Sequence, residues 1–350
     1  MVESTLSDGV PAPGPPLQWC HEVVDDVSRT FAISINLLEE PMSSYICVGY
    51  LLCRVPDTVE DAKHIPNDEK ADLLSLYDAA LDPDDGTTPE AFVAAIEEWI
   101  PEDPESPADW EVVRRTARVF EAYDAFDAEV SGAMRPPIRE LVDGMETFVE
   151  RSNEETGLRI EDREELDRYC YFVAGTVGHL ITNLTALETD DGTERYLRER
   201  AESFGLLLQL VNIAKDVHTD LRDEDNVYVP ANWLRAHGVP QEHILAPEYR
   251  AGAGVAVKRV IDHARSFRGE AREYLHRLGR STEGHLSAWA LPYLLAVATL
   301  RELDANLDEV FTESSVKVSR EEVTSLVAAF TTASPDVDLL RDLERSIDAE

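Results

Sequence analysis

The chain of 350 residues has little lysine, little cysteine and no long apolar run. No apolar segment reaches the roughly 18 residues of a membrane-spanning helix, so we expect no helix of this kind. The four cysteines form no CxxC pair, and no cysteine or histidine cluster has zinc-site spacing. Three cysteines lie in apolar stretches, which favours buried, reduced thiols; they are Cys47, Cys53 and Cys170.

Basic residues are few: 32 lysines and arginines stand against 70 aspartates and glutamates, a formal net charge of −38. A chain with so much negative charge repels the phosphate backbone of a nucleic acid, so we expect no nucleic-acid partner. A lysine-poor acidic surface suits a high-salt cytoplasm, because counter-ions screen the repulsion. A halophilic source is therefore a hypothesis, and a merely acidic protein is the alternative. The lysines are Lys63, Lys70, Lys215, Lys258 and Lys317.

The two ends of the chain differ in composition from its middle. Residues 1–17 are proline-rich and lack the basic and apolar parts of a secretory signal. We therefore expect a disordered leader and a cytoplasmic location. Residues 18–333 are expected to form one domain, because neither a repeat nor a linker divides them. Residues 334–350 are expected to be an acidic carboxyl-terminal tail.

Helix-period apolar patterns run through most of the chain, whereas alternating strand patterns are scarce. Turn-forming residues separate the patterns, and we count Pro136-Pro137 among these breaks. The expected architecture is an all-α, single-domain helical bundle. The predicted helices are 18–39, 41–62, 68–81, 89–99, 107–128, 135–154, 162–188, 192–221, 251–278, 284–308 and 320–332.

A first candidate site follows an apolar segment, residues 45–55. Asp57, Glu60 and Asp61 are spaced i, i+3 and i+4, which places three carboxylates on one helix face. Like charges this close together need cations, and carboxylate oxygens suit Mg²⁺. We predict that all three bind the metal. The alternative is an ordinary solvated helix end.

A second polar stripe follows another apolar run, residues 204–211. Asn212, Asp216 and Asp220 recur every four residues, and Gln209 extends the stripe. We predict that the first three also bind Mg²⁺. Two such clusters facing each other inside a helical bundle would hold a diphosphate. Exposed surface acids are again the alternative.

Four ordered motifs resemble those of the squalene/phytoene synthase family, over roughly residues 18–310. Residues 28–31 read SRTF, similar to the family's Ser-Arg-[Ser/Thr]-Phe, and residues 57–61 match DxxED. Residues 169–178 match YCxxVAGxVG, and residues 209–220 are similar to QxxNIxRDxxED. The resemblance implies the isoprenoid-synthase fold, with a central apolar cavity.

The resemblance also implies a reaction of two allylic diphosphates, either farnesyl or geranylgeranyl diphosphate. They are joined into a cyclopropylcarbinyl diphosphate, which then ionises and rearranges. Mg²⁺ would neutralise the leaving diphosphate, and the apolar walls would keep water from the carbocation. The implied catalytic residues are Asp57, Asp61, Asp216, Asp220 and Tyr169, with Tyr169 beside the cation. The implied substrate contacts are Ser28, Arg29, Phe31, Tyr50, Arg54, Gln209, Asn212 and Lys215.

A later segment favours the squalene-forming branch of the family. Residues 310–320 resemble the VFxxxVKIRK stretch of that branch, which implies that Lys317 and Arg320 bind NADPH. The product would be squalene, formed through presqualene diphosphate. Alternatives are phytoene or dehydrosqualene formation without reduction, and a non-catalytic protein of this fold that serves in binding or assembly. We expect a monomer, with peripheral membrane contact left open by the apolar product.

The second acid motif departs from the family pattern. Thr219 stands where the family has glutamate, so this cluster lacks one acid. Asp223 is a candidate to restore the charge. Arg222 is a candidate to replace the arginine that is usual just beyond the motif.

We predict that the fold needs salt. Because counter-ions screen repulsion among the acids, the thermal unfolding midpoint should rise from low-salt buffer to molar KCl. Circular dichroism at increasing KCl measures this midpoint, with equal osmolarities of sucrose as the control. A midpoint that does not change with salt would contradict the halophilic hypothesis.

Overall fold

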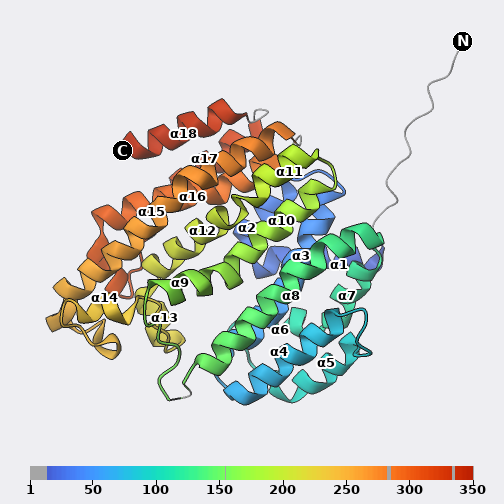
Figure 1. Ribbon diagram of the computed structural model, residues 1–350, viewed down its shortest axis with the longest axis horizontal. Coiled ribbons are helices and arrows are strands. Elements are labelled where there is room, and N and C mark those ends of the chain that lie inside the picture. Colours follow the sequence, from blue (N-terminus) through green and yellow to red (C-terminus); the bar gives the residue numbers. More distant parts are fainter. Residues whose placement is uncertain (1–13, 154, 282–284, 333–335, 350) are drawn as a thin grey trace, which may run out of the picture.

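Helices make up most of the computed structural model, which describes residues 14–153, 155–281, 285–332 and 336–349 (Figure 1). In these ranges extended pairing is limited to two isolated β-bridges. The predicted all-α bundle is therefore confirmed, and its buried apolar side chains form one continuous core.

The helices lie close to the predicted ranges, but several predicted helices are divided. The first half of the chain contains α1 Pro15–Val27, α2 Arg29–Asn36, α3 Met42–Asp61, α4 Asn67–Leu81, α5 Pro89–Ile96, α6 Pro107–Arg114, α7 Thr116–Asp124 and α8 Ala128–Arg151. The second half contains α9 Arg163–Cys170, the π-helical turn η2 Tyr171–Gly175, α10 Thr176–Ala186, α11 Asp191–Arg198, α12 Ala201–Lys215, α13 Val217–Asp223, α14 Ala231–Arg235, α15 Arg250–Ser281, α16 His285–Ala305, η5 Leu307–Phe311, α17 Arg320–Thr332 and α18 Val337–Ala349.

Seven helices build the middle of the part of the chain that the structure describes. α12 packs along α15 and α16, α8 packs against α3, α4 and α10, and α10 also contacts α12 (Figure 1). Gly178 on α10 allows one of these contacts, because a Cβ there would lie 2.2 Å from the carbonyl oxygen of Ala201. Gly205 on α12 is equally restricted by the carbonyl oxygen of Ala174. The glycines therefore serve close helix approach.

Ser28 divides the predicted helix 18–39 into α1 and α2. Its backbone is extended, with φ −149° and ψ 100°, and its Oγ accepts a hydrogen bond from the N–H of Phe31 at 3.3 Å. Serine is a favoured N-cap because its side chain satisfies a donor that the first helical turn leaves free. The family motif at residues 28–31 thus marks the start of a helix.

The expected break at Pro136-Pro137 is wrong, because α8 continues through both prolines. Proline lacks an N–H, so Pro137 leaves the carbonyl of Ala133 without its helical donor. Asn183 of α10 supplies one, at 3.0 Å from Nδ2 to that oxygen. In α3 the same problem arises at Pro56, and Tyr77 of α4 donates to the freed carbonyl of Leu52 at 2.8 Å. Tertiary contacts therefore keep these helices intact.

The two chain ends differ in part from expectation. Residues 1–13 of the predicted leader lie outside the described residues, and α1 already begins at Pro15. The predicted carboxyl-terminal tail, residues 334–350, contains α18, which packs on α16. Glu344 of α18 is buried and accepts hydrogen bonds from Arg268 and Tyr293.

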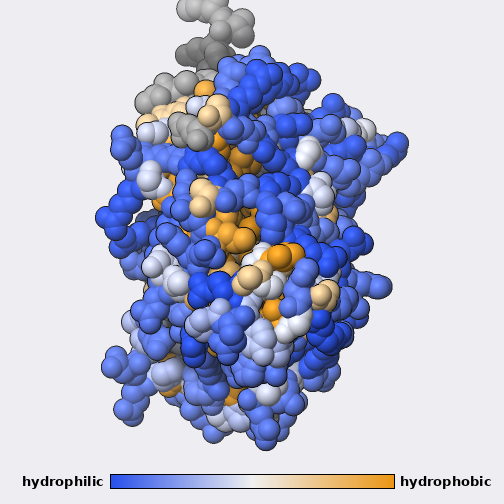
Figure 2. Space-filling model, turned by 90° about the vertical axis from the view of Figure 1, so that its left-hand side faces the viewer, coloured by the Kyte–Doolittle hydropathy of each residue, from blue (hydrophilic) through white to orange (hydrophobic). Residues whose placement is uncertain are grey.

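The surface is strongly polar. Figure 2 shows one face covered mostly by hydrophilic residues, with a small group of hydrophobic ones near its middle. None of the helices in the described residues combines the length and apolar character that crossing a bilayer requires. The four cysteines are free thiols, and all except Cys53 are buried. The prediction of buried, reduced thiols is thus confirmed for Cys47 and Cys170, whereas Cys53 is only half-buried.

Replacing Tyr77 by phenylalanine should destabilise the fold. Tyr77→Phe removes the donor to the Leu52 carbonyl, which Pro56 cannot replace, and a buried unsatisfied carbonyl costs about 1–3 kcal/mol. Urea unfolding measures this loss. Tyr249→Phe is the matched control, because its half-buried ring lies outside the core of the bundle. Equal stability of the two variants would contradict the role given to Tyr77.

Candidate active site

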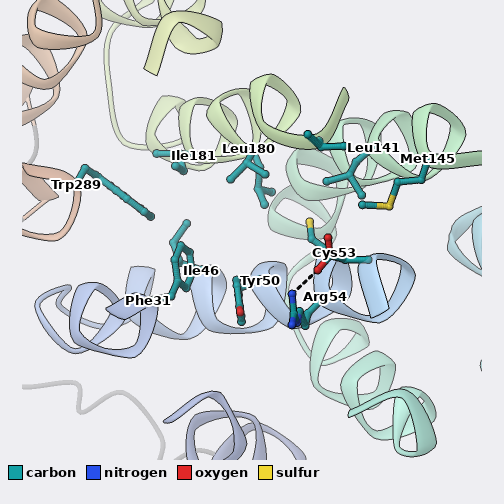
Figure 3. A pocket seen from close by; sticks show the side chains of 13 residues that line it. Phe31, Ile46, Tyr50, Cys53, Arg54, Leu141, Met145, Leu180, Ile181 and Trp289 are labelled. Atoms are coloured by element: carbon teal, nitrogen blue, oxygen red, sulfur yellow. Dashed lines mark hydrogen bonds and ion pairs between the residues drawn. The ribbon is translucent and has the colours of Figure 1, made fainter. Parts of the chain in front are cut away.

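An apolar cavity of about 200 Å³ lies between six elements of the bundle. In Figure 3 Phe31, Ile46 and Tyr50 extend from one side, and Leu180 and Ile181 from the other. The rings of Phe31 and Tyr50 stack with centroids 4.3 Å apart. The central apolar cavity is therefore present. Its lining is Phe31, Ile46, Tyr50, Cys53, Arg54, Asp57, Leu141, Met145, Val173, Val177, Leu180, Ile181 and Trp289.

Charged groups lie at one part of this cavity wall. Arg54 donates from Nε and Nη2 to the two carboxylate oxygens of Asp109 on α6, both at 2.9 Å, and from Nη1 to Asp57. Its guanidinium is thus held by two acids. Arg54 also lines a neighbouring polar cavity of about 650 Å³. The Arg54–Asp57 pair therefore stands where apolar and polar space meet.

The first acid cluster lies beyond this pair, at the end of α3. Glu60 and Asp61 line a second polar cavity, of about 350 Å³, together with Lys63 and Lys70. Burial and the charge of Asp57 raise the pKa of Glu60 to about 8. The same two causes raise the pKa of Asp61 well above its usual range, although Asp61 is the most exposed of the three. The three carboxylates thus lie together at the end of α3, where burial and mutual repulsion outweigh the attraction of Lys70 for Glu60.

The second acid cluster spans a helix break. Asp216 separates α12 from α13, with φ −100° and ψ 15°. The backbone bonds from Asp216 to Asn212 and from Asp220 to Asp216 still have i, i−4 spacing, both at 2.8 Å. Burial, followed by the charges of Glu224 and Asp216, raises the pKa of Asp220 to about 9. Lys215 forms an ion pair with Asp216 at 3.1 Å.

The structure brings the two clusters into one electrostatic system. Burial raises the pKa of Glu224, and the charges of Asp57 and Asp216 raise it further, against a hydrogen bond from Asn226. Asp57 belongs to the first cluster and Asp216 to the second. The acids of the two motifs therefore do not point into solvent on opposite sides of the molecule.

Tyr169 is buried close to Glu60 and Asp61 of the first acid cluster. Its hydroxyl donates to the hydroxyl of Tyr228 at 3.1 Å, and the two rings stack with centroids 4.7 Å apart. Asn226 Nδ2 donates to the same Tyr228 oxygen at 3.1 Å. Burial, then the charges of Tyr228 and Glu60, raise the pKa of Tyr169 well above its usual range. Tyr169 is thus a neutral phenol close to the first acid cluster.

The remaining predicted site residues differ in how far they are exposed to solvent. Gln209 is half-buried and Asn212 is exposed, so the stripe on α12 does not wholly face the interior. Arg29 is exposed beside the Ser28 cap. Lys317 and Arg320 are exposed between η5 and α17, and η5 packs on α13. The predicted cofactor segment therefore begins beside the second acid motif.

The donor set fits a divalent cation. Carboxylate oxygens with raised pKa values are the hard ligands that Mg²⁺ prefers, and its binding would stabilise their charged forms. Within the described residues no three acids lie close enough to enclose an ion by themselves. Mg²⁺ commonly takes one or two carboxylates and completes its shell with water and substrate phosphate. Asp57, Asp61, Asp216 and Asp220 are the residues that would hold it.

Several residues of the site were missed from the sequence. They are Lys63, Lys70, Asp109, Glu224 and Tyr228. Lysine is rare here, and two of the five lysines follow DxxED within ten residues, which is a usable signal. Glu224 continues the four-residue spacing from Asp220. Asp109 and Tyr228 have no local signal, because only the fold brings them to Arg54 and Tyr169.

Several known proteins are similar to this chain. A bifunctional lycopene cyclase/phytoene synthase of Colletotrichum graminicola is 28% identical over 286 residues, 79% of this chain and 44% of that protein. Squalene synthases of Schizosaccharomyces pombe and Homo sapiens are 24% and 26% identical over 313 residues. Each alignment covers 89% of this chain, and 64% and 69% of those proteins. The chain thus spans about half to two thirds of these relatives.

Solved structures share the architecture. TcSQS in complex with a ligand superposes with a TM-score of 0.79 at 23% identity, over 96% of this chain and 90% of that one. A dehydrosqualene synthase superposes with a TM-score of 0.58 at 18% identity, over 96% and 97%. At these identities the likeness shows the fold alone.

The helical bundle, its apolar cavity and its paired acid motifs define an all-α protein of the isoprenoid synthase type. A model of one family of this type, squalene/phytoene synthase, matches residues 24–322. The chain belongs to the squalene/phytoene synthase family.

The crowded acids should make the metal-free protein less stable as the pH rises. Unfolded aspartate and glutamate ionise near pH 4, whereas Glu60 and Asp220 hold their protons to about pH 8 and 9. Between these limits the folded chain binds more protons than the unfolded chain, so its free energy of unfolding falls with rising pH. Urea unfolding between pH 5 and 9 measures the slope.

Asp220→Asn should flatten this slope and raise the free energy of unfolding at pH 8, because it removes a buried charge among like charges. Asp84→Asn is the matched control, since Asp84 is exposed in the turn after α4. Identical slopes for Asp220→Asn and the unchanged protein would contradict the environment assigned to Asp220.

Proposed function

We propose that this protein is a Mg²⁺-dependent squalene synthase. It joins two molecules of farnesyl diphosphate into presqualene diphosphate and reduces that intermediate to squalene with NADPH. The observation that supports the proposal best is the meeting of two environments at Arg54 and Asp57, an apolar cavity on one side and an acidic cleft on the other. A prenyl diphosphate has the same division, an apolar chain with a charged head.

The cleft suits the diphosphate head. Mg²⁺ held by the acids would neutralise the leaving diphosphate and so favour formation of an allylic carbocation. Lys63 adds positive charge to both polar cavities, and Lys70 adds it to the smaller one. Lys70 is buried and donates to the backbone carbonyl of Glu60, so its position is held by α3. Both lysines would attract and orient the phosphates.

The apolar cavity suits the prenyl chain. Its walls leave few groups that could deliver water to a carbocation, and excluding water prevents quenching to an alcohol. The stacked rings of Phe31 and Tyr50 present aromatic faces, which stabilise nearby positive charge. Tyr169, a neutral phenol held by Tyr228, is the group we assign to the departing proton.

We assign NADPH binding to the segment that contains Lys317 and Arg320. Lys317 and Arg320 are exposed cations in a strongly acidic chain, and η5 brings the segment towards α13. These features suit the phosphates of NADPH. The competing function is phytoene or dehydrosqualene synthesis, which the phytoene synthase relative favours. A catalytically inactive binding protein is a third candidate.

A product assay distinguishes these functions. We expect squalene from farnesyl diphosphate and Mg²⁺ only when NADPH is present, in high-salt buffer and analysed by mass spectrometry. Dehydrosqualene from farnesyl diphosphate, or phytoene from geranylgeranyl diphosphate, without any effect of NADPH would establish the competing function. No C30 or C40 product from either substrate would leave only the binding role.

Asp61→Asn should lower turnover by about 100-fold or more, because charge stabilisation by a bound metal is worth several kcal/mol. Initial rates at saturating Mg²⁺ measure this loss. The exposed Asp84→Asn variant should keep the unchanged rate. Full activity of Asp61→Asn would remove the metal assignment on α3.

A further inference from the structure

Glu224 stands between the two acid clusters, at a position that neither family motif contains. It follows α13 directly, and its backbone N–H donates to the carbonyl of Asp220 at 3.2 Å. One helical turn therefore separates the two side chains. Glu224 lines both polar cavities, and so does Asp61 of α3. The end of α13 and the end of α3 thus border the same space.

The motif position that lacks its acid, and the one replacement acid suggested by the sequence, are placed less well. Thr219, where the motif lacks its acid, is exposed and contributes to neither polar cavity. Asp223 is exposed and lines only the wider cavity. Glu224 is half-buried at the boundary of the two cavities. Position therefore favours Glu224 over its neighbour as the missing acid.

The charges agree with this position. Glu224 raises the pKa of Glu60 and Asp61 on α3 and the pKa of Asp220 on α13. Lys63 partly offsets the charge of Glu224 itself. The carboxylate at position 224 thus lies near enough to acids of both motifs to act on their charge.

The carboxylate of Glu224 is also available to a ligand. Among the hydrogen bonds of the described residues, it takes part in one, a long contact of 3.4 Å from Asn226 Nδ2. One carboxylate oxygen of Asp57, by comparison, already accepts a hydrogen bond from Arg54. Asp225, the next residue, is paired with Arg159 at 2.9 Å.

We propose that Glu224 supplies the oxygen ligand that the second motif lacks at Thr219, and that it binds a divalent cation shared with the acids of α3. The cation is of the hard, oxygen-binding kind, Mg²⁺ or Mn²⁺, with diphosphate oxygens completing its shell. This inference rests on the proposed function of the site. It assigns to the chain a way of keeping the cation site despite the altered motif.

Cation binding to the full chain tests this role without any turnover. Mn²⁺ binding in the presence of inorganic pyrophosphate is followed by electron paramagnetic resonance, and Mg²⁺ binding by calorimetry. Glu224→Gln should weaken binding by about 10-fold or more, the scale seen when a group that supports a metal site is removed. Asp223→Asn, an adjacent acid of equal charge, is the matched control and should bind as the unchanged chain does.

A second measurement shows whether Glu224→Gln folds. Its free energy of unfolding without metal at pH 8 should equal or exceed that of the unchanged chain, because a like charge is lost. Mg²⁺ and pyrophosphate should raise the free energy of unfolding of Glu224→Gln by less than they raise that of the unchanged chain.

The outcomes separate this inference from the proposed function. Tight binding by the unchanged chain and equally tight binding by Glu224→Gln would overturn the role of Glu224 and leave the function standing. If Glu224→Gln and Asp223→Asn lose equal affinity for the cation, the effect comes from net charge alone. This result would also overturn the role of Glu224. No cation binding by the unchanged chain would overturn both.

Discussion

The structure depends on holding like charges together beside an apolar cavity. Asp57, Glu60 and Asp61 share one face of α3, and the charge of Glu224 acts on Glu60 and Asp61. Asp216 of the second motif acts in turn on Glu224. Without cations this convergence is unfavourable, and the acids respond by holding protons. The same repulsion gives the site its affinity for divalent ions. An ion that neutralises the acids both stabilises the fold and completes the site.

Rigid support makes this convergence possible. α3 must continue through Pro56 to place the acids, and the hydroxyl of Tyr77 satisfies the carbonyl that the proline leaves free. Asp109 grips Arg54 with two hydrogen bonds, which fixes the guanidinium next to Asp57. Tyr77 lines none of the three cavities, whereas Asp109 lines the larger polar one. Part of the site's geometry is therefore determined by a residue outside it.

The sequence predicts those features of the site that depend on residues close together along the chain. Spacing of i, i+3 and i+4 placed the first acids on one helix face, and burial and repulsion in the structure agree with that pattern. The second motif was harder, since α12 ends at Lys215 and Asp216 lies outside both helices. The breaks expected at Pro136 and Pro137 were wrong for a related reason. A hydrogen-bond donor on another helix, which satisfies the carbonyl of Ala133, cannot be predicted from the sequence around the two prolines.

The sequence by itself determined the helical class and the family, because apolar periodicity and ordered motifs are properties of neighbouring residues. Only the tertiary structure decided which charges meet. Glu224 looks in the sequence like one of several acids in a polar loop, and its position relative to α3 follows from the packing of helices distant along the chain. Tyr228 likewise acquires its place against Tyr169 through folding alone. Electrostatic and hydrogen-bond partners depend on distance in space, which local patterns do not encode.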